Sequence, residues 1–97
     1  MSPKRSFFDA KFSEQWKKSY RQLQVQEKKG TDKVIMALIS DDPTPGMRVK
    51  PIEPDKYYNE ARCTDGDRVI YRIEDGAILF EDIVPHDFID KYGREPK

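Results

Sequence analysis

The sequence predicts an α+β domain in which a short N-terminal strand and two helices precede three to four antiparallel strands. Two observations lead to this fold class. Apolar residues recur at helical spacing between positions 12 and 39, and at alternating spacing after position 57. Asp75-Gly76 stands between two runs of apolar, β-branched and aromatic residues, which is typical of a β-hairpin with a two-residue turn. We expect the helices to pack as an αα-hairpin on one face of the sheet and to leave the other face free.

The N-terminal strand and the first helix follow from the apolar residues before position 24. Alternating apolar residues predict a short half-buried strand from Ser6 to Phe12. Ser13 is suited to cap a helix, and the apolar stripe that follows predicts a helix from Ser13 to about Gln26. The stripe consists of Phe12, Trp16, Tyr20 and Leu23. We expect Lys28-Lys29-Gly30 to close this helix, because cations and a glycine are favoured at helix C-termini.

The remaining short elements are predicted around the prolines and glycines. A second helix, capped by Thr31 or Asp32, is expected to end near Ser40. Residues 47–52 read as an edge strand, since Pro51 cannot donate a ladder hydrogen bond. Residues 57–63 predict a further strand, with one of the two tyrosines at its start and Ala61 pointing inward. Residues 87–92 allow one helical turn.

The hairpin between Arg68 and His86 is expected to be the centre of the sheet. If Asp75 and Gly76 form the loop, counting outward fixes the facing residues. The expected pairs are Ile73–Ile78, Tyr71–Phe80 and Ile70–Glu81. One face is then apolar, and the other begins at Arg68. The cations expected to converge on this second face are Arg48, Lys50, Arg62, Arg68 and Arg72.

Composition limits the class of protein. The 97 residues suffice for one domain, 1–97, in which we expect 1–5 and 93–97 to be flexible. The 18 basic and 18 acidic residues cancel, so any binding of nucleic acid must depend on a local patch. The single cysteine fits a reducing cytosol, and one cysteine with one histidine cannot build a zinc site. No apolar run is long enough to span a membrane, and we expect a cytoplasmic protein.

Four segments, in this order and spacing, resemble the RelE/ParE superfamily of type II toxins. Phe12-Ser13-Glu14-Gln15-Trp16-Lys17-Lys18 is similar to the family's first strand running into its helix. The segment 42–52 resembles the stretch after the family's second helix. The segment 58–73 resembles its central strands, including the recurrent Arg68-Val69-Ile70-Tyr71 pattern. Val84-Pro85-His86-Asp87 resembles its terminal strand, and the likeness implies a RelE-like fold over nearly the whole chain.

The resemblance implies an endoribonuclease (mRNA interferase) that cleaves mRNA, often on the ribosome, and is inhibited by a cognate antitoxin in a hetero-oligomer. Arg68 falls at the arginine that members use at the scissile phosphate, and His86 falls where several members place a catalytic histidine. The resemblance also implies auxiliary RNA-binding positions, which are Lys50, Arg62, Arg48 and Tyr92. Cleavage of this kind requires no metal, and we expect no cofactor. Asp87 departs from the pattern, because many active members carry arginine there.

The chemistry of these residue types agrees with that implication. Attack by a ribose 2′-hydroxyl needs proton transfer, which histidine performs near neutral pH, and cations at the phosphate, which arginine supplies. Three alternatives remain open. His86 can be a surface residue and Arg68 the partner of a nearby carboxylate such as Glu81. The chain can be a ParE-like protein that inhibits DNA gyrase by binding it. It can also be a non-catalytic member that acts through protein contacts, for instance through an apolar groove beside the αα-hairpin that suits a partner helix.

Overall fold

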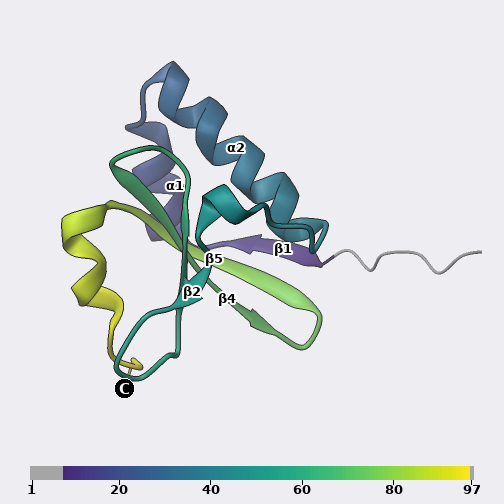
Figure 1. Ribbon diagram of the computed structural model, residues 1–97, viewed down its shortest axis with the longest axis vertical. Helices are drawn as coiled ribbons and strands as arrows, with labels where there is room; N and C mark the ends of the chain where they lie inside the picture. The colour runs from purple at the N-terminus through teal and green to yellow at the C-terminus, as the bar shows by residue number, and fades with distance from the viewer. Residues whose placement is uncertain (1–7, 97) are drawn as a thin grey trace, which may run out of the picture.

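The computed structural model describes residues 8–96, and its elements follow the expected order of strand, helices and then strands (Figure 1). The elements are β1 (Asp9–Phe12), α1 (Glu14–Arg21), α2 (Val25–Ile39), the 3₁₀ turn η1 (Pro45–Met47), β2 (Lys50–Pro51), β3 (Asn59–Arg62), β4 (Asp67–Glu74), β5 (Ala77–Pro85) and the 3₁₀ turn η2 (His86–Tyr92). The flexibility expected for residues 1–5, and the first two residues of the expected N-terminal strand, lie outside the described residues. The α+β class is confirmed.

The sheet is mixed and five-stranded, in the order β1-β5-β4-β3-β2. β1 pairs in parallel with β5, while the other neighbours are antiparallel. The N-terminal strand therefore extends the antiparallel sheet that the sequence predicts. β1 is exposed along its length, but Phe12 still contacts the core, with its ring centroid 5.0 Å from that of Phe80 and 5.6 Å from that of Trp16.

The helices divide differently from the prediction. α1 ends at Arg21 and α2 already begins at Val25, so the expected helix end at Gly30 is wrong. The N–H of Gln24, the residue before α2, donates to Glu27 Oε1 at 2.8 Å. Without this hydrogen bond, that N–H would have no partner at the start of the helix. Gly30 lies in the middle of α2 for a packing reason. A Cβ there would lie 2.4 Å from the Cys63 carbonyl oxygen, so the missing side chain lets α2 approach the end of β3.

The central hairpin follows the expected register at its tip. Asp75 and Gly76 have φ angles of +52° and +79°, as a two-residue turn requires, and the pairs Ile73–Ile78 and Tyr71–Phe80 are confirmed. A β-bulge then shifts the register, so Asp82, and not Glu81, lies opposite Ile70. The expected Ile70–Glu81 pair is therefore wrong.

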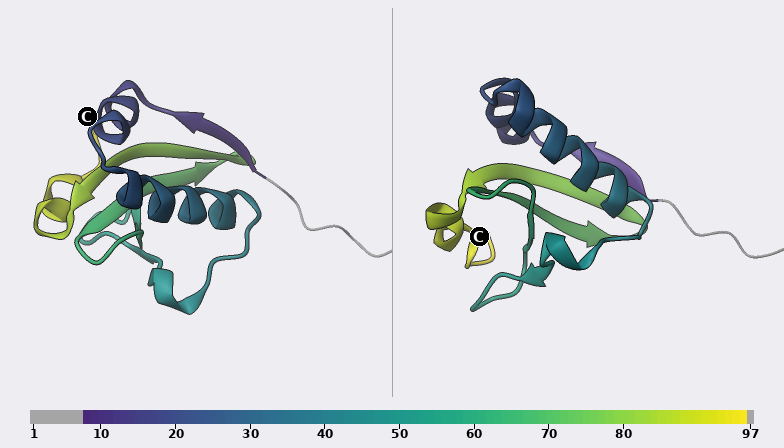
Figure 2. Two further views of the ribbon diagram at one scale, coloured as in Figure 1. Left: turned by 90° about the horizontal axis from the view of Figure 1, so that it is seen from above. Right: turned by 45° about the horizontal axis from the view of Figure 1, so that its top comes forward.

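Both faces of the sheet are covered, which corrects the expectation of a free second face. The helices lie on one side of the sheet (Figure 2), and on the other side Ile52, which follows β2, is buried with Ile70 of β4 and Ile89 of η2. The main core includes Trp16, Val34, Leu38, Ala61, Val69, Tyr71, Ile78 and Phe80. A second buried cluster consists of Ile52, Tyr58, Ile70, Val84 and Ile89. The cluster forms because η2 and the chain before β3 fold over the second face. Ala61 and Tyr58 consequently pack in different cores.

Candidate functional site

Three of the expected site residues lie at the same end of the sheet. Arg62 and Arg68 are direct partners in the β3–β4 ladder, and Arg68 is the partner of Val84 on β5. His86 follows two residues after Val84, where its backbone N–H donates to the Gly66 carbonyl at 2.8 Å. Strand geometry places the Cα atoms of His86 and Arg68 roughly 8 Å apart. This arrangement can bring the Arg68 guanidinium and the His86 imidazole to one phosphodiester, with Arg62 beside them.

Arg68 is held in place by acceptors on two sides. Its side chain is 14% exposed, and its Nε lies 3.7 Å from Glu60 Oε1. Its Nη1 donates to the carbonyls of Asp67, at 3.0 Å, and Thr64, at 3.4 Å. Within residues 8–96 these contacts use Nε and Nη1, which leaves Nη2 for an anion. Glu60 is itself 7% exposed, so Arg68 presents a rigid but partly neutralised cation.

His86 is the first residue of η2 and is open to solvent. Its side chain is 60% exposed, and Asp87 Oδ1 lies 3.7 Å from its Nδ1. The Asp87 side chain is almost fully exposed, so this contact is screened and weak. The imidazole is accessible for proton transfer, while the neighbouring Asp87 carboxylate would repel a bound phosphate.

The other expected RNA-binding residues are less clearly placed for that role. Lys50 pairs with Glu60 across β2 and β3 and borders a hollow of about 410 Å³, which Glu53 and Asp90 also line. Arg48 is exposed at the end of η1. The Tyr92 hydroxyl donates to Asp82. Burial raises the pKa of Tyr92, and this hydrogen bond raises it further. The structure therefore groups Arg62, Arg68 and His86, with Lys50 beside carboxylates and Tyr92 committed to an internal contact.

Asp82 is an important residue that the sequence reasoning did not single out. It is 2% exposed and accepts hydrogen bonds from Ser19 Oγ at 2.6 Å, from the Ile83 N–H at 2.7 Å and from the Tyr92 hydroxyl. One carboxylate thus joins α1, β5 and η2. A charged residue within the apolar run from Phe80 to Val84 was the available signal, because such residues are buried only with partners.

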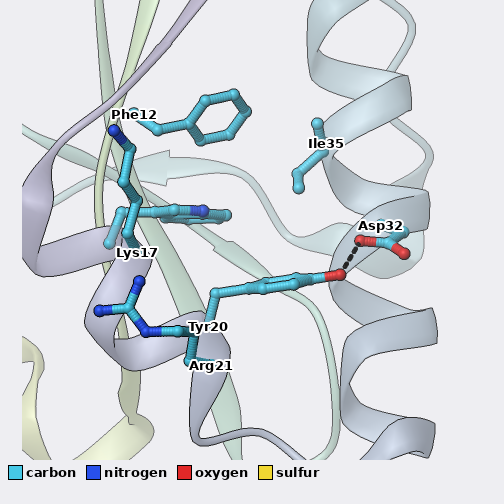
Figure 3. A pocket seen from close by; sticks show the side chains of 7 residues that line it. Phe12, Lys17, Tyr20, Arg21, Asp32 and Ile35 are labelled. Atoms are coloured by element: carbon cyan, nitrogen blue, oxygen red, sulfur yellow. Dashed lines mark hydrogen bonds between the residues drawn. The ribbon is translucent and has the colours of Figure 1, made fainter.

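An apolar groove lies between α1 and α2, as Figure 3 shows. Its volume is about 380 Å³, and it is lined by Phe12, Trp16, Lys17, Tyr20, Arg21, Asp32 and Ile35. The Tyr20 hydroxyl donates to Asp32 at 2.8 Å and links the two helices across the groove. Lys17 and Arg21 add positive charge to a mainly aromatic floor. The expected groove beside the helices is therefore present.

The described residues form no metal site, no reactive thiol and no membrane-spanning helix. Residues 8–96 contain no group of three histidine, cysteine, aspartate or glutamate side chains placed to hold a metal ion. Burial raises the pKa of the Cys63 thiol to about 11, so this cysteine is a poor nucleophile. Within the described chain, the helices are too short or too polar to cross a bilayer.

Comparisons with known proteins show the fold. No protein-family model and no curated protein matches the sequence. Among solved structures, YafQ from E. coli is 20% identical, covers 82% of this chain and 94% of its own, and has a TM-score of 0.72. A copper-bound mutant toxin from Helicobacter pylori is 14% identical, with coverage of 82% and 96% and a TM-score of 0.73.

A third match is a chain of the RelB–RelE antitoxin–toxin complex from Methanococcus jannaschii. It is 15% identical, covers 87% of this chain and 99% of its own, and has a TM-score of 0.68. All three cover nearly their whole length at low sequence identity. The chain therefore has the RelE-like fold, and its activity has to be argued from its own residues.

Proposed function

We propose that this protein is the toxin of a type II toxin–antitoxin system and that it acts in the cytoplasm as an endoribonuclease on mRNA. The observation that carries the proposal is the pairing of Arg62 with Arg68 beside the end of β5, where His86 emerges. The shared fold supports it, because solved structures with this fold include toxin–antitoxin complexes.

The proposed reaction is an attack of the ribose 2′-oxygen on the adjacent phosphorus. The bond from phosphorus to the 5′-oxygen breaks, which leaves a 2′,3′-cyclic phosphate and a 5′-hydroxyl. Arg68 stabilises the extra negative charge on the phosphate through Nη2, a base takes the proton of the 2′-hydroxyl, and His86 gives a proton to the leaving 5′-oxygen. Glu60 is the carboxylate beside Arg68, so it is the candidate for the second proton-transfer group.

A second candidate function is a non-catalytic role through protein contacts. It is favoured by the same Glu60 carboxylate, which neutralises Arg68, and by Asp87 next to His86. Glu60→Gln separates the two functions. If Glu60 is a base, the variant binds RNA but no longer cleaves it; if Glu60 only repels phosphate, the variant binds RNA more tightly than the wild type does.

The proposal is tested by induced expression in bacteria, followed by mapping of RNA 5′ ends. We expect growth arrest and new mRNA ends with the wild type, and neither with Arg68→Ala or His86→Ala. Lys18→Glu is the matched control, because Lys18 is exposed on α1 away from the three residues. Toxicity without RNA ends would point to a gyrase-binding or other protein-binding toxin, and the absence of toxicity would reject the toxin assignment. Repeating the cleavage with and without ribosomes determines whether the ribosome is needed.

We further propose that the groove between α1 and α2 receives a helix of the antitoxin. Its aromatic floor suits an apolar helix face, and Lys17 and Arg21 suit carboxylates beside that face. Tyr20→Ala should then weaken antitoxin binding by at least about tenfold. Val25→Glu serves as the control, because Val25 is exposed on α2 and does not line the groove. Equal binding of the two variants would place the antitoxin elsewhere.

A further inference from the structure

A third hollow, of about 430 Å³, lies between α2, η1 and the end of β3. Its apolar wall consists of Val34, Ala37 and Met47. Arg62 borders it from β3, and Lys33 borders it from α2. β2 pairs only with Asn59 and Glu60, so the edge of β3 beyond Glu60 has no neighbouring strand. The hollow is thus open at the surface and reaches one of the two paired arginines.

The charge of this hollow distinguishes it from the one beside Lys50. Lys33 and Arg62 line it, and no aspartate or glutamate among the described residues does. The hollow beside Lys50 is lined by that lysine and three carboxylates, Glu53, Glu60 and Asp90. A polyanion that is bound at Arg68 and extends toward Arg62 is therefore attracted, whereas one that extends toward Lys50 is repelled by the three carboxylates.

The competing contact of Arg62 is weak enough to be replaced. Arg62 Nη2 lies 2.7 Å from Asp65 Oδ1, but the Asp65 side chain is 99% exposed. Ion pairs with so exposed a partner contribute little to stability and are screened by salt. A bound phosphate can therefore take the place of Asp65 at Arg62.

We propose that this hollow is a subsite for one nucleotide of RNA next to the scissile phosphate. The inference rests on the proposed function and extends it to substrate recognition. The base packs against the wall formed by Val34, Ala37 and Met47, and its phosphate lies between Lys33 and Arg62. An apolar surface with cations at its rim is what a nucleotide needs, since the base offers a flat apolar face and the phosphate a charge. The RNA then crosses from Arg68 on β4 to Arg62 on β3 and passes around the sheet edge to α2.

The test is a titration of ¹⁵N-labelled protein with a trinucleotide that carries 2′-O-methyl groups and cannot be cleaved. We expect shifts of the backbone amide signals of Gly30, Lys33 and Ala37. Lys33→Glu should weaken binding of the trinucleotide about tenfold, which is the effect of removing one charge-assisted contact. Lys18→Glu makes the same change of charge on α1, outside the hollow, and should bind as the wild type does.

The outcomes separate this subsite from the proposed function. Shifts in the hollow and a specific loss with Lys33→Glu support the subsite even if the wild type cleaves no RNA, in which case the nuclease proposal fails alone. Cleavage of RNA without shifts in the hollow, or with equal binding by the two lysine variants, overturns the subsite and leaves the nuclease proposal standing. Absence of any trinucleotide binding overturns the subsite as well.

Discussion

Replacing Asp82 by alanine tests how the structure holds η2 against the rest of the domain. The variant removes the acceptor for the Ser19 hydroxyl, the Tyr92 hydroxyl and the Ile83 N–H. Hydrogen bonds to charged groups contribute about 1.5–3 kcal/mol each, but the cost of burying the carboxylate disappears too. We therefore expect the free energy of unfolding to fall by roughly 2–4 kcal/mol, out of about 5–15 kcal/mol for a domain.

Urea denaturation followed by circular dichroism measures this loss. For a domain of this size, the expected change corresponds to a decrease in Tm of roughly 10–25 °C. Asp82→Asn keeps one carbonyl acceptor and should lose about half as much. Asp90→Ala is the control, because Asp90 is exposed on η2, and it should change stability by less than about 0.5 kcal/mol.

Hydrogen exchange locates the effect within the molecule. Since Asp82 joins η2 to α1, amides in residues 86–92 should lose protection in Asp82→Asn before those of β4 do. This variant keeps the measurement informative if Asp82→Ala does not fold. Equal stabilities of the Asp82 and Asp90 variants, or unchanged exchange in residues 86–92, would contradict the role assigned to this carboxylate.

Three further predictions follow from contacts and pKa values. Gly30→Ala should destabilise the domain by about 1–3 kcal/mol in a urea titration, although alanine favours helices, because its Cβ would press on the Cys63 carbonyl. Gly46→Ala meets no atom within 4 Å and should be nearly neutral, so equal losses would reject the packing role of Gly30. Burial and, to a smaller extent, the neighbouring Asp82 carboxylate raise the pKa of Glu81, and the nearby Arg72 guanidinium opposes this shift without cancelling it. The Glu81 carboxyl therefore binds its proton more tightly in the folded protein than in the unfolded chain. The stability of the folded protein falls as pH rises through the raised pKa. Glu81→Gln should be more stable than the wild type at pH 7, by less than about 1 kcal/mol, and equally stable at pH 3; a gain at both pH values would contradict this. With its pKa raised to about 11, Cys63 should react with iodoacetamide at pH 8 roughly 100-fold more slowly than a free thiol, and labelling at the free rate would show that the thiol is exposed.

The parts of the fold that local chemistry determines were predictable from the sequence. Asp75-Gly76 favours positive φ angles, so the turn and the pairs Ile73–Ile78 and Tyr71–Phe80 followed directly. The bulge between Ile70 and Tyr71, where Glu81 is the extra residue on β5, was not predictable, because neither strand carries a turn residue that marks it. Gly30 was misread for a similar reason. A glycine at a helix end and a glycine at a close contact look the same in the sequence, and only the position of β3 distinguishes them.

The surroundings of the candidate site depend on contacts between strands. Strand order and register place Arg62, Arg68 and His86 at one end of the sheet. The pairing of Arg68 with Glu60 depends on a diagonal contact between β3 and β4, which cannot be read from either strand alone. The cover over the second face was missed because the apolar residues of η2, such as Ile89, are too few to give a helical pattern.

The central claim is that the end of the sheet bearing Arg68 and His86 cleaves RNA, and the chemistry of the RNA ends tests it most directly. The measurement is cleavage of a defined mRNA by purified protein, with and without ribosomes, followed by identification of both new ends. We expect 5′-hydroxyl and 2′,3′-cyclic phosphate ends, formed at least about 100-fold more slowly by His86→Ala and by Arg68→Ala. Cleavage at the wild-type rate by folded His86→Ala protein, or no cleavage by the wild type, would contradict it.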